Sequence, residues 1–482
     1  MPLICRMSCR IRSATLAVAL GIFALIAHGG ARAAEEPSGV AELSPRAMLA
    51  IATHDADAFL RAWTAQRDRA LAALGDPAQA SAREAVLHRW SAGLIDYPYF
   101  HWRETGRSIP VDWAPYREAI ARLHAEGAAD ALKADAPHVG SWLHDVAWRA
   151  TRSDPRYATG DNRSLRARVD AITTSGFTQA VQRELVANAL VVHVDENGAR
   201  GIEPLADTLA ALGGDAAQVE ALRAQARAED AIDPLRPAHT YQTVDGVDLR
   251  LHASRPRGEA PAPAMLWFHG GSGDTGHWSH CPVFCRTADA LGVLVIQVEY
   301  RTAQRFNTLP SDAARDAEAA LAWVRANAER LGVDVSRIVV AGFSTGGSMA
   351  SQLALSHPRD VRAAAVMSAC VRPEADAWFR RALEDAGQPV PPAQVQQLGP
   401  SSASMLLLHA RDDKVCPYAH AIEFHARAVA LDLPVDLDTV DGGHFFAFAS
   451  PPARDQAREA FRRFLITRGL AAADGAPASP RP

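Results

Sequence analysis

The chain of 482 residues has little lysine, little cysteine and no cluster of basic residues. Lys133 and Lys414 are the only lysines among 50 basic residues, and the formal net charge of −5 is spread along the chain. Proteins that bind nucleic acid usually carry a basic stripe, so we expect no nucleic-acid partner. Hydrophobic residues make up 48% and charged residues 22%, which excludes a disordered or fibrous protein. The length predicts two or three domains.

The sequence also lacks an apolar run long enough to span a bilayer comfortably, which takes about 20 residues. The apolar run 14–27 follows three arginines and precedes Ala31-Arg32-Ala33. A positive start, a short apolar core and a small-x-small site are typical of a secretory signal peptide. We therefore predict that residues 1–33 are removed and that the mature protein is periplasmic or extracellular, with no stable membrane span. An uncleaved membrane anchor is the less favoured alternative, because the run is short.

Of six cysteines, two lie within the predicted signal peptide. In an oxidising compartment the other four can form two disulfides in three possible pairings. These four residues are Cys281, Cys285, Cys370 and Cys416. The chain contains no CxxC pair with a matching histidine pair, so we expect no metal site.

Two hydrophobic patterns divide the chain. Over residues 34–236, apolar residues recur at helical spacing, for example Val86, Trp90 and Leu94, which predicts a mainly α-helical domain of unknown function. Over residues 237–470, continuous apolar runs alternate with helical stretches. This second pattern predicts a mostly parallel sheet covered on both faces, a three-layer α/β domain. Residues 471–482 are predicted to be a disordered tail.

The second domain contains a glycine-flanked serine between a strand and a helix. The expected strand 338–341 is followed at once by Gly342-Phe343-Ser344-Thr345-Gly346 and then by a helix. So sharp a turn strains the backbone at the serine, and glycines two positions before and after it avoid side-chain clashes. Ser344 is therefore the predicted nucleophile.

A serine hydroxyl needs a base and a carboxylate that orients the base. His444 lies in a glycine-flanked loop directly after the expected strand 435–440, which favours it over the other downstream histidines; His409, for example, closes a strand and has a structural interpretation. After the strand 405–408, both Asp412 and Asp413 could supply the acid, and the spacing favours Asp413.

Acyl transfer also needs hydrogen-bond donors for the oxyanion. The sequence His269-Gly270-Gly271-Ser272-Gly273 follows an earlier strand, and its glycines leave backbone N–H groups accessible. We predict an oxyanion hole formed by the N–H groups of Gly270, Gly271 and Thr345. Cys370 and Cys416 each follow a strand at the same edge of the sheet, which suggests a disulfide near the site as a hypothesis.

Together these motifs resemble the α/β-hydrolase superfamily, most closely its acetylesterase and hormone-sensitive-lipase-like carboxylesterases, with some dienelactone-hydrolase-like features. The resemblance spans about residues 241–470 and includes Glu299-Tyr300-Arg301. It implies a Ser344–Asp413–His444 triad, a scaffold role for His269, and pairing of Arg301 with a helix acid such as Asp312. Ser272 departs from the third glycine that many relatives have. The resemblance covers none of the residues 34–236.

We therefore expect an exported serine hydrolase that cleaves small-molecule or polymer-borne carboxylic esters through an acyl-enzyme and needs no cofactor or metal. One alternative is a serine peptidase of the prolyl-oligopeptidase type, although that family's additional domain is a β-propeller and the one here has a helical pattern. Another alternative is a catalytically inactive hydrolase-fold binding protein. The sequence does not specify acyl chain length, alcohol or oligomeric state.

Overall fold

The computed structural model describes residues 43–471, with gaps at 75–79, 106, 108, 110–112, 127–135, 232, 257–260, 282, 376–378, 381–382, 385 and 449–450. The predicted signal peptide lies outside the described residues, as does the predicted tail apart from its first residue. Among the described residues, no helix combines the length and apolarity needed to cross a membrane.

The chain forms two compact units. Unit 1 extends to Tyr157 and also contains Ser164–Val192 and Pro204–Ala221, whereas unit 2 contains Ala158–Arg163, His193–Glu203 and Leu222 onwards. The predicted boundary after residue 236 falls where the strands begin. Three stretches that precede it in the sequence nevertheless pack with unit 2.

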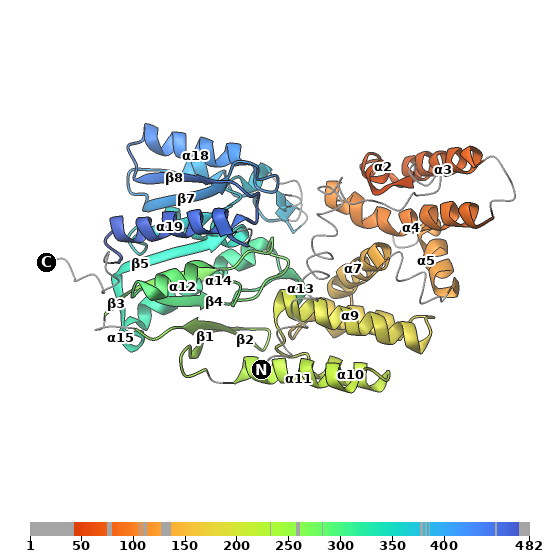
Figure 1. Ribbon diagram of the computed structural model, residues 1–482, viewed down its shortest axis with the longest axis horizontal. Coiled ribbons are helices and arrows are strands. Elements are labelled where there is room, and N and C mark those ends of the chain that lie inside the picture. The colour runs from red at the N-terminus through yellow and green to blue at the C-terminus, as the bar shows by residue number, and fades with distance from the viewer. Residues whose placement is uncertain are drawn as a thin grey trace. The chain divides into compact units, whose positions relative to one another are not determined.

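The described residues before the first strand are organised as helices, as the apolar spacing predicted (Figure 1). The core of unit 1 is aromatic: the rings of Phe59 and Tyr97 stack 3.7 Å apart, and the Tyr97 hydroxyl donates a hydrogen bond to the carbonyl of His54. The helices are α2 (Pro45–Leu49), α3 (Ala56–Ala73), α4 (Ala80–Thr105), α5 (Ala114–Glu126), α7 (Ala136–Ser153), η2 (Pro155–Tyr157), α8 (Arg163–Thr173), α9 (Gln179–Asn197), α10 (Glu203–Ala211) and α11 (Ala216–Asp230).

In the part of the chain that the structure describes, unit 2 is built around an eight-stranded sheet of order β1-β2-β4-β3-β5-β6-β7-β8. Strands β1 and β2 form an antiparallel hairpin at one edge, β2 pairs antiparallel with β4, and every other pair is parallel. The mostly parallel sheet predicted from the sequence is thus confirmed. The strands are β1 (Ala238–Val244), β2 (Val247–Ala253), β3 (Ala262–Phe268), β4 (Leu294–Val298), β5 (Val333–Phe343), β6 (Ala363–Met367), β7 (Ser404–Ala410) and β8 (Val435–Val440).

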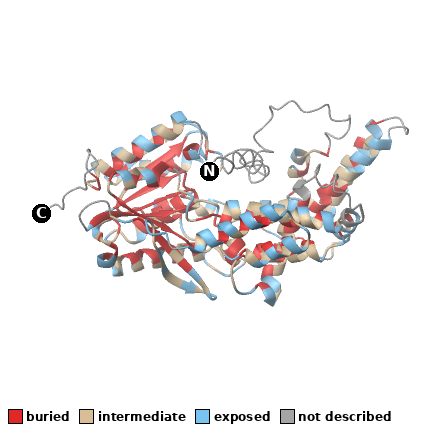
Figure 2. Cartoon of the chain, turned by 60° about the horizontal axis from the view of Figure 1, so that its bottom comes forward, coloured by how far each residue is buried: buried red, intermediate tan, exposed pale blue. Residues whose placement is uncertain are grey.

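Helices cover both faces of this sheet, which makes the three layers that were predicted. Side chains of α14, α15, α16 and α18 pack on one face, and those of α12 and α19 pack on the other. Figure 2 shows the strands largely in the buried colour between helices with exposed outer surfaces. The helices of this unit are α12 (Val283–Ala290), α13 (Ala303–Phe306), α14 (Pro310–Ala326), α15 (Ala328–Leu331), α16 (Thr345–Ser356), η3 (Pro373–Ala375), η4 (Gln394–Gln397), α18 (Tyr418–Ala430), η5 (Phe446–Phe448) and α19 (Pro451–Thr467).

The parallel register aligns the carboxyl ends of the central strands. Gly342 of β5 lies opposite Phe268 of β3 on one side and Val366 of β6 on the other, and Ala410 of β7 lies opposite Val440 of β8. Loops that leave these strand ends therefore meet at one edge of the sheet, where α/β proteins commonly bind ligands.

Candidate active site

Ser344 occupies the sharp turn between β5 and α16. Its φ of 54° and ψ of −123° lie in a region that L-residues rarely adopt. A Cβ atom at Gly342 would lie 2.3 Å from the carbonyl oxygen of Gly346, and one at Gly346 would lie 2.1 Å from the carbonyl oxygen of Phe268. Both positions therefore require glycine, for the steric reason that the sequence suggested.

The structure brings Ser344, His444 and Asp413 together from three separate loops. The Nε2 atom of His444 lies 3.0 Å from the Ser344 Oγ atom, and its Nδ1 atom lies 2.8 Å from Asp413 Oδ2. All three residues are buried. A carboxylate at Nδ1 makes that nitrogen the donor, which leaves Nε2 free to accept the serine proton.

The two aspartates after β7 have different environments. Asp413 contacts His444, whereas Asp412 is exposed and its Oδ1 atom accepts the backbone N–H of Gly443 at 2.9 Å. The Asp413 Oδ1 atom in turn accepts the backbone N–H groups of Val415 and Cys416, at 2.8 and 2.9 Å. Of the two candidates, the geometry thus places Asp413 against the imidazole.

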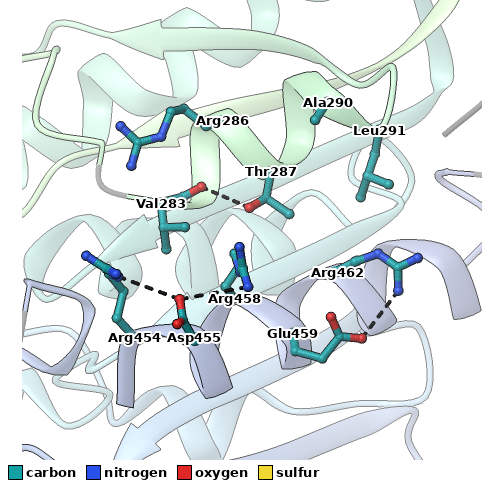
Figure 3. Close-up of a pocket in the computed structure, with 10 residues that line it drawn as sticks. All are labelled: Val283, Arg286, Thr287, Ala290, Leu291, Arg454, Asp455, Arg458, Glu459 and Arg462. Carbon is teal, nitrogen blue, oxygen red and sulfur yellow. Dashed lines mark hydrogen bonds and ion pairs between the residues drawn. The ribbon is translucent and has the colours of Figure 1, made fainter. Parts of the chain in front are cut away.

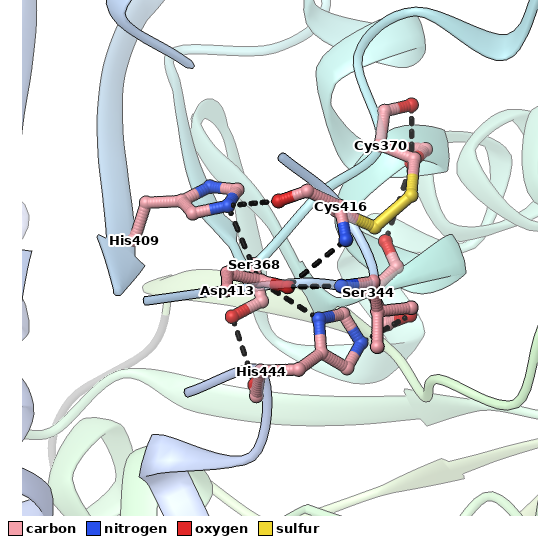
Figure 4. Close-up of a disulfide and its surroundings, with 9 residues drawn as sticks. Ser344, Ser368, Cys370, His409, Asp413, Cys416 and His444 are labelled. Atoms are coloured by element: carbon pink, nitrogen blue, oxygen red, sulfur yellow. Dashed lines mark hydrogen bonds and ion pairs between the residues drawn. A yellow bond between two sulfur atoms is a disulfide. The ribbon is translucent and has the colours of Figure 1, made fainter. Parts of the chain in front are cut away.

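A second histidine also contacts the Asp413 carboxylate. His409 Nε2 lies 2.8 Å from the carbonyl oxygen of Cys416 and 3.2 Å from Asp413 Oδ2 (Figure 4). Because a carbonyl can only accept, this Nε2 carries a hydrogen that faces both oxygens. Burial alone would raise the pKa of Asp413, but hydrogen bonds from His409 and His444 outweigh burial and hold the pKa well below its usual range.

The loops that carry these residues are tied to one another. Cys370 and Cys416 form a disulfide between the segments after β6 and β7, as hypothesised from the sequence, and Cys281 pairs with Cys285. The hydroxyl of Ser368, which is fully buried, donates a hydrogen bond to the backbone carbonyl of His444 at 2.9 Å (Figure 4). These links limit the movement of the acid and base loops.

The glycine loop after β3 runs beside the serine. A Cβ atom at Gly270 would lie 3.2 Å from the Ser344 Cβ atom, so the backbone of the loop passes close to the nucleophile. Gly271 has a φ of 126°, and a Cβ atom there would lie 2.0 Å from the carbonyl oxygen of Thr275. Thr345 is the first residue of α16, where backbone N–H groups have no partner within the helix. Ser272, the departure from the family pattern, adopts a φ of 59°.

His269 and Tyr300 fix the orientation of this loop. The Nδ1 atom of His269 lies 2.7 Å from the Gly270 carbonyl oxygen, and the Tyr300 hydroxyl donates to the His269 carbonyl at 2.7 Å. A planar trans peptide points its carbonyl and its N–H in opposite directions, so holding the Gly270 carbonyl also directs the Gly271 N–H. Burial lowers the pKa of His269 to about 3, which keeps the ring neutral at ordinary pH.

Arg301 pairs with acids of a helix, as the resemblance implied with Asp312 as an example. The acid it binds most closely is Asp316, through Nε at 2.9 Å and Nη2 at 2.8 Å. Asp312 lies farther away, at 3.7 Å. Asp316 is one helical turn beyond Asp312 on α14, and the sequence alone does not distinguish two acids on the same face of a helix.

Two contacts at the site were missed from the sequence. His409 was interpreted as structural because it ends a strand, and Ser368 was not considered. One signal for the His409 contact was present in the sequence: His409 lies at the end of the strand that leads into the Asp413 loop, four residues before Asp413.

A separate pocket, between α12 and α19, is lined by residues such as Arg286 and Arg458 and shares none with the site (Figure 3). Among the described residues, no group of three or more potential ligands is placed to hold a metal ion.

Residues 265–420 match the family described as alpha/beta hydrolase fold, which agrees with the sheet order and the position of the serine turn. The sheet-containing part of unit 2 is therefore an α/β-hydrolase-fold domain.

The chain is 38% identical over 145 residues to ethyl acetate hydrolase from Pseudomonas putida, covering 29% of this chain and 45% of that protein. It is 40% identical over 100 residues to esterase LipI from Mycobacterium tuberculosis, covering 20% of this chain and 30% of that protein. Among solved structures, an esterase from Thermogutta terrifontis is 23% identical, with a TM-score of 0.46, and the match covers 50% of this chain and 96% of that one. The chain spans less than half the length of the two curated relatives.

Proposed function

We propose that this protein hydrolyses carboxylic esters, with Ser344 as nucleophile, His444 as general base and acid, and Asp413 as the orienting carboxylate. The observation that carries the proposal is the continuous series of contacts from Ser344 Oγ to His444 Nε2 at 3.0 Å and from His444 Nδ1 to Asp413 Oδ2 at 2.8 Å. The names of the relatives, which include esterases, support the same chemistry.

The reaction proceeds in two halves. His444 Nε2 takes the proton of Ser344 as Oγ attacks the ester carbonyl carbon, and Asp413 stabilises the imidazolium that results. The imidazolium then gives this proton to the leaving alcohol as the ester C–O bond breaks, which leaves an acyl-serine. Water, deprotonated by His444, attacks the acyl-enzyme and releases the acid, and the proton returns to Ser344.

The negative oxygen formed in each half needs preorganised donors. We assign this role to the backbone N–H groups of Gly270, Gly271 and Thr345. Two features support the assignment: the glycine loop passes beside Ser344, and Thr345 begins α16. The buried hydrogen bonds of His269 and Tyr300 hold the loop before substrate binds, so little reorganisation is needed during the reaction.

The test is hydrolysis of p-nitrophenyl esters from acetate to palmitate by the wild type and by Ser344→Ala. The matched control is Ser356→Ala, which removes an exposed hydroxyl from the same helix. We expect wild-type hydrolysis to survive in the control and to disappear in Ser344→Ala. Hydrolysis that persists in Ser344→Ala would exclude this serine. A wild type that cleaves only aminoacyl nitroanilides would favour the peptidase alternative, and one inactive on both would favour a binding protein.

We also propose that the chain is exported. The charged start and short apolar run of residues 1–33 support this proposal, and two disulfides in unit 2 suit an oxidising compartment. Expression of the full chain in a Gram-negative host, followed by fractionation and sequencing of the mature amino terminus, tests it. A periplasmic or secreted product that starts near residue 34 is expected, and a cytoplasmic product that keeps Met1 would contradict export.

A further inference from the structure

Two short segments from the amino-terminal half of the chain belong to unit 2. They are Ala158–Arg163 and His193–Glu203, and both precede the first strand. Asn162 joins them: its Nδ2 atom donates to the carbonyl of Arg200 at 2.7 Å, and its Oδ1 atom lies 2.9 Å from His193 Nε2. The family match begins only at residue 265, so it assigns no role to either segment.

These segments contribute to a cluster of four charged residues around Arg305. Arg305 Nη1 binds Glu299 Oε1 at 2.6 Å, and its Nε atom binds Asp161 Oδ1 at 2.8 Å. Arg200 binds the same Glu299 carboxylate at 3.0 Å. The Arg305 side chain is 4% exposed and that of Asp161 is 14% exposed. With two cations and two anions the cluster is formally neutral, so neutralising either acid leaves one excess positive charge in a buried environment, with both arginines on the remaining carboxylate.

Arg305 lies on α13, and this helix holds the glycine loop. The backbone N–H groups of Ala303 and Gln304 donate to the carbonyls of Gly273 and Asp274, at 2.9 and 3.0 Å. The Gln304 side chain adds a third bond, to Asp274 Oδ2 at 3.0 Å.

The bonded end of the loop in turn holds Gly271, which directly follows Gly270, the glycine beside Ser344. The N–H groups of Asp274 and Thr275 donate to the Gly271 carbonyl at 2.9 and 3.0 Å. Contacts thus run without interruption from Asp161, through Arg305 and α13, to the glycine loop.

We propose that Asp161 is a positioning residue for the oxyanion hole: by fixing Arg305 it holds α13, and α13 holds the glycine loop in the geometry that acyl transfer needs. The inference rests on the ester hydrolysis proposed above. It gives a segment of the amino-terminal half a role in the chemistry of the hydrolase fold, although Asp161 itself touches no reacting atom.

The experiment compares Asp161→Asn with Asp245→Asn in the full mature chain. Asp245 pairs with Arg163 of the same segment at 2.6 Å and lies in the β1–β2 turn, and its contacts among the described residues include none with α13. Asp161→Asn removes the ion pairs of this segment with Arg305 and, at 3.5 Å, with Arg200, whereas Asp245→Asn removes the ion pair of Arg163. Of these pairs, the one with Arg305 lies on the path to the glycine loop. The readouts are kcat and KM on p-nitrophenyl esters, thermal unfolding, and the fraction of Ser344 that a phosphonate ester labels.

Loss of one oxyanion donor lowers kcat by about 10²- to 10³-fold, so displacement of the loop that carries the donors should lower kcat by about 10- to 100-fold. We expect that loss in kcat for Asp161→Asn, with KM within about threefold and labelling still complete but slower, whereas Asp245→Asn should keep kcat within about threefold. Equal kcat values for Asp161→Asn and the wild type, or equal losses in the two variants, would overturn the inference while the proposed function stands. A wild type without ester hydrolysis would refute both.

If Asp161→Asn does not fold, Arg305→Lys provides the same test. Lysine keeps the buried charge but cannot contact Asp161 and Glu299 simultaneously with a planar fork. A folded Arg305→Lys protein with reduced kcat and unchanged KM would support the inference, and wild-type kcat would refute it.

Discussion

Replacement of His409 by leucine should lower kcat for ester hydrolysis without a comparable change in KM. His409 Nε2 lies between the Cys416 carbonyl and the Asp413 carboxylate, so leucine removes the single N–H that faces both the Asp413 Oδ2 atom and the loop that carries it. His444 binds the same Oδ2 atom at 2.8 Å. The carboxylate should then have more freedom to rotate, and the imidazole that it orients should spend less time aligned with Ser344.

The size of the effect follows from the contacts that remain. A hydrogen bond to a charged group contributes about 1.5–3 kcal/mol, which corresponds to at most about 10- to 150-fold in rate if it is expressed wholly in the transition state. Val415 and Cys416 still donate two backbone bonds to Asp413 Oδ1, so the carboxylate keeps much of its position. We therefore expect a loss of about 10- to 100-fold in kcat.

The assay measures kcat and KM on a p-nitrophenyl ester, with active sites counted by phosphonate labelling so that misfolded protein is not mistaken for slow enzyme. His409→Gln should recover most of the activity, because its amide nitrogen can donate from near the position of the histidine Nε2 atom. His425→Leu, on α18, is the control, since His425 is not among the described contacts of Asp413. Fully labelled His409→Leu protein with kcat within about threefold of wild type would refute the reasoning.

Three further predictions follow from the same site. Asp413→Asn should lower kcat by about 10³- to 10⁴-fold. Asp412→Asn should keep kcat within about fivefold, because asparagine can still accept the N–H of Gly443. Equal losses would contradict the assignment of Asp413 as the carboxylate that orients His444. Because hydrogen bonds hold the pKa of Asp413 below its ordinary value, its carboxylate stabilises the fold above about pH 4, and this stabilisation fades as the pH falls further. Between pH 6 and pH 3, the free energy of unfolding in urea should therefore fall less in Asp413→Asn than in the wild type. Equal losses would count against the pKa argument. Gly346→Ala places a Cβ atom 2.1 Å from a backbone oxygen and should lower the free energy of unfolding in urea by about 1–3 kcal/mol. Gly399→Ala, whose Cβ would meet no atom within 4 Å, should leave that free energy nearly unchanged. An equally small loss at both positions would show that the turn relaxes.

Much of the sheet-containing unit was predictable because its signals are local. Continuous apolar runs predicted the central parallel strands. The β1–β2 turn is equally local, since Asp245 and Gly246 both adopt the positive φ that a tight hairpin turn requires. The glycines around Ser344 predicted the sharp strand-to-helix turn, since the steric requirement acts within five residues. His444 was identified by a short loop directly after a strand. In each case, the residues that determine the local structure are close neighbours in the sequence.

Only the tertiary structure decided which side chains meet. Asp412 and Asp413 are adjacent and chemically identical, and the path of the loop after β7 turns one toward His444 and leaves the other exposed. Asp161 and Arg305 are 144 residues apart, and their contact depends on the packing of a segment that the sequence pattern assigns to the helical half. Side-chain direction and long-range pairing depend on how whole elements pack, and no local pattern of residues encodes that packing.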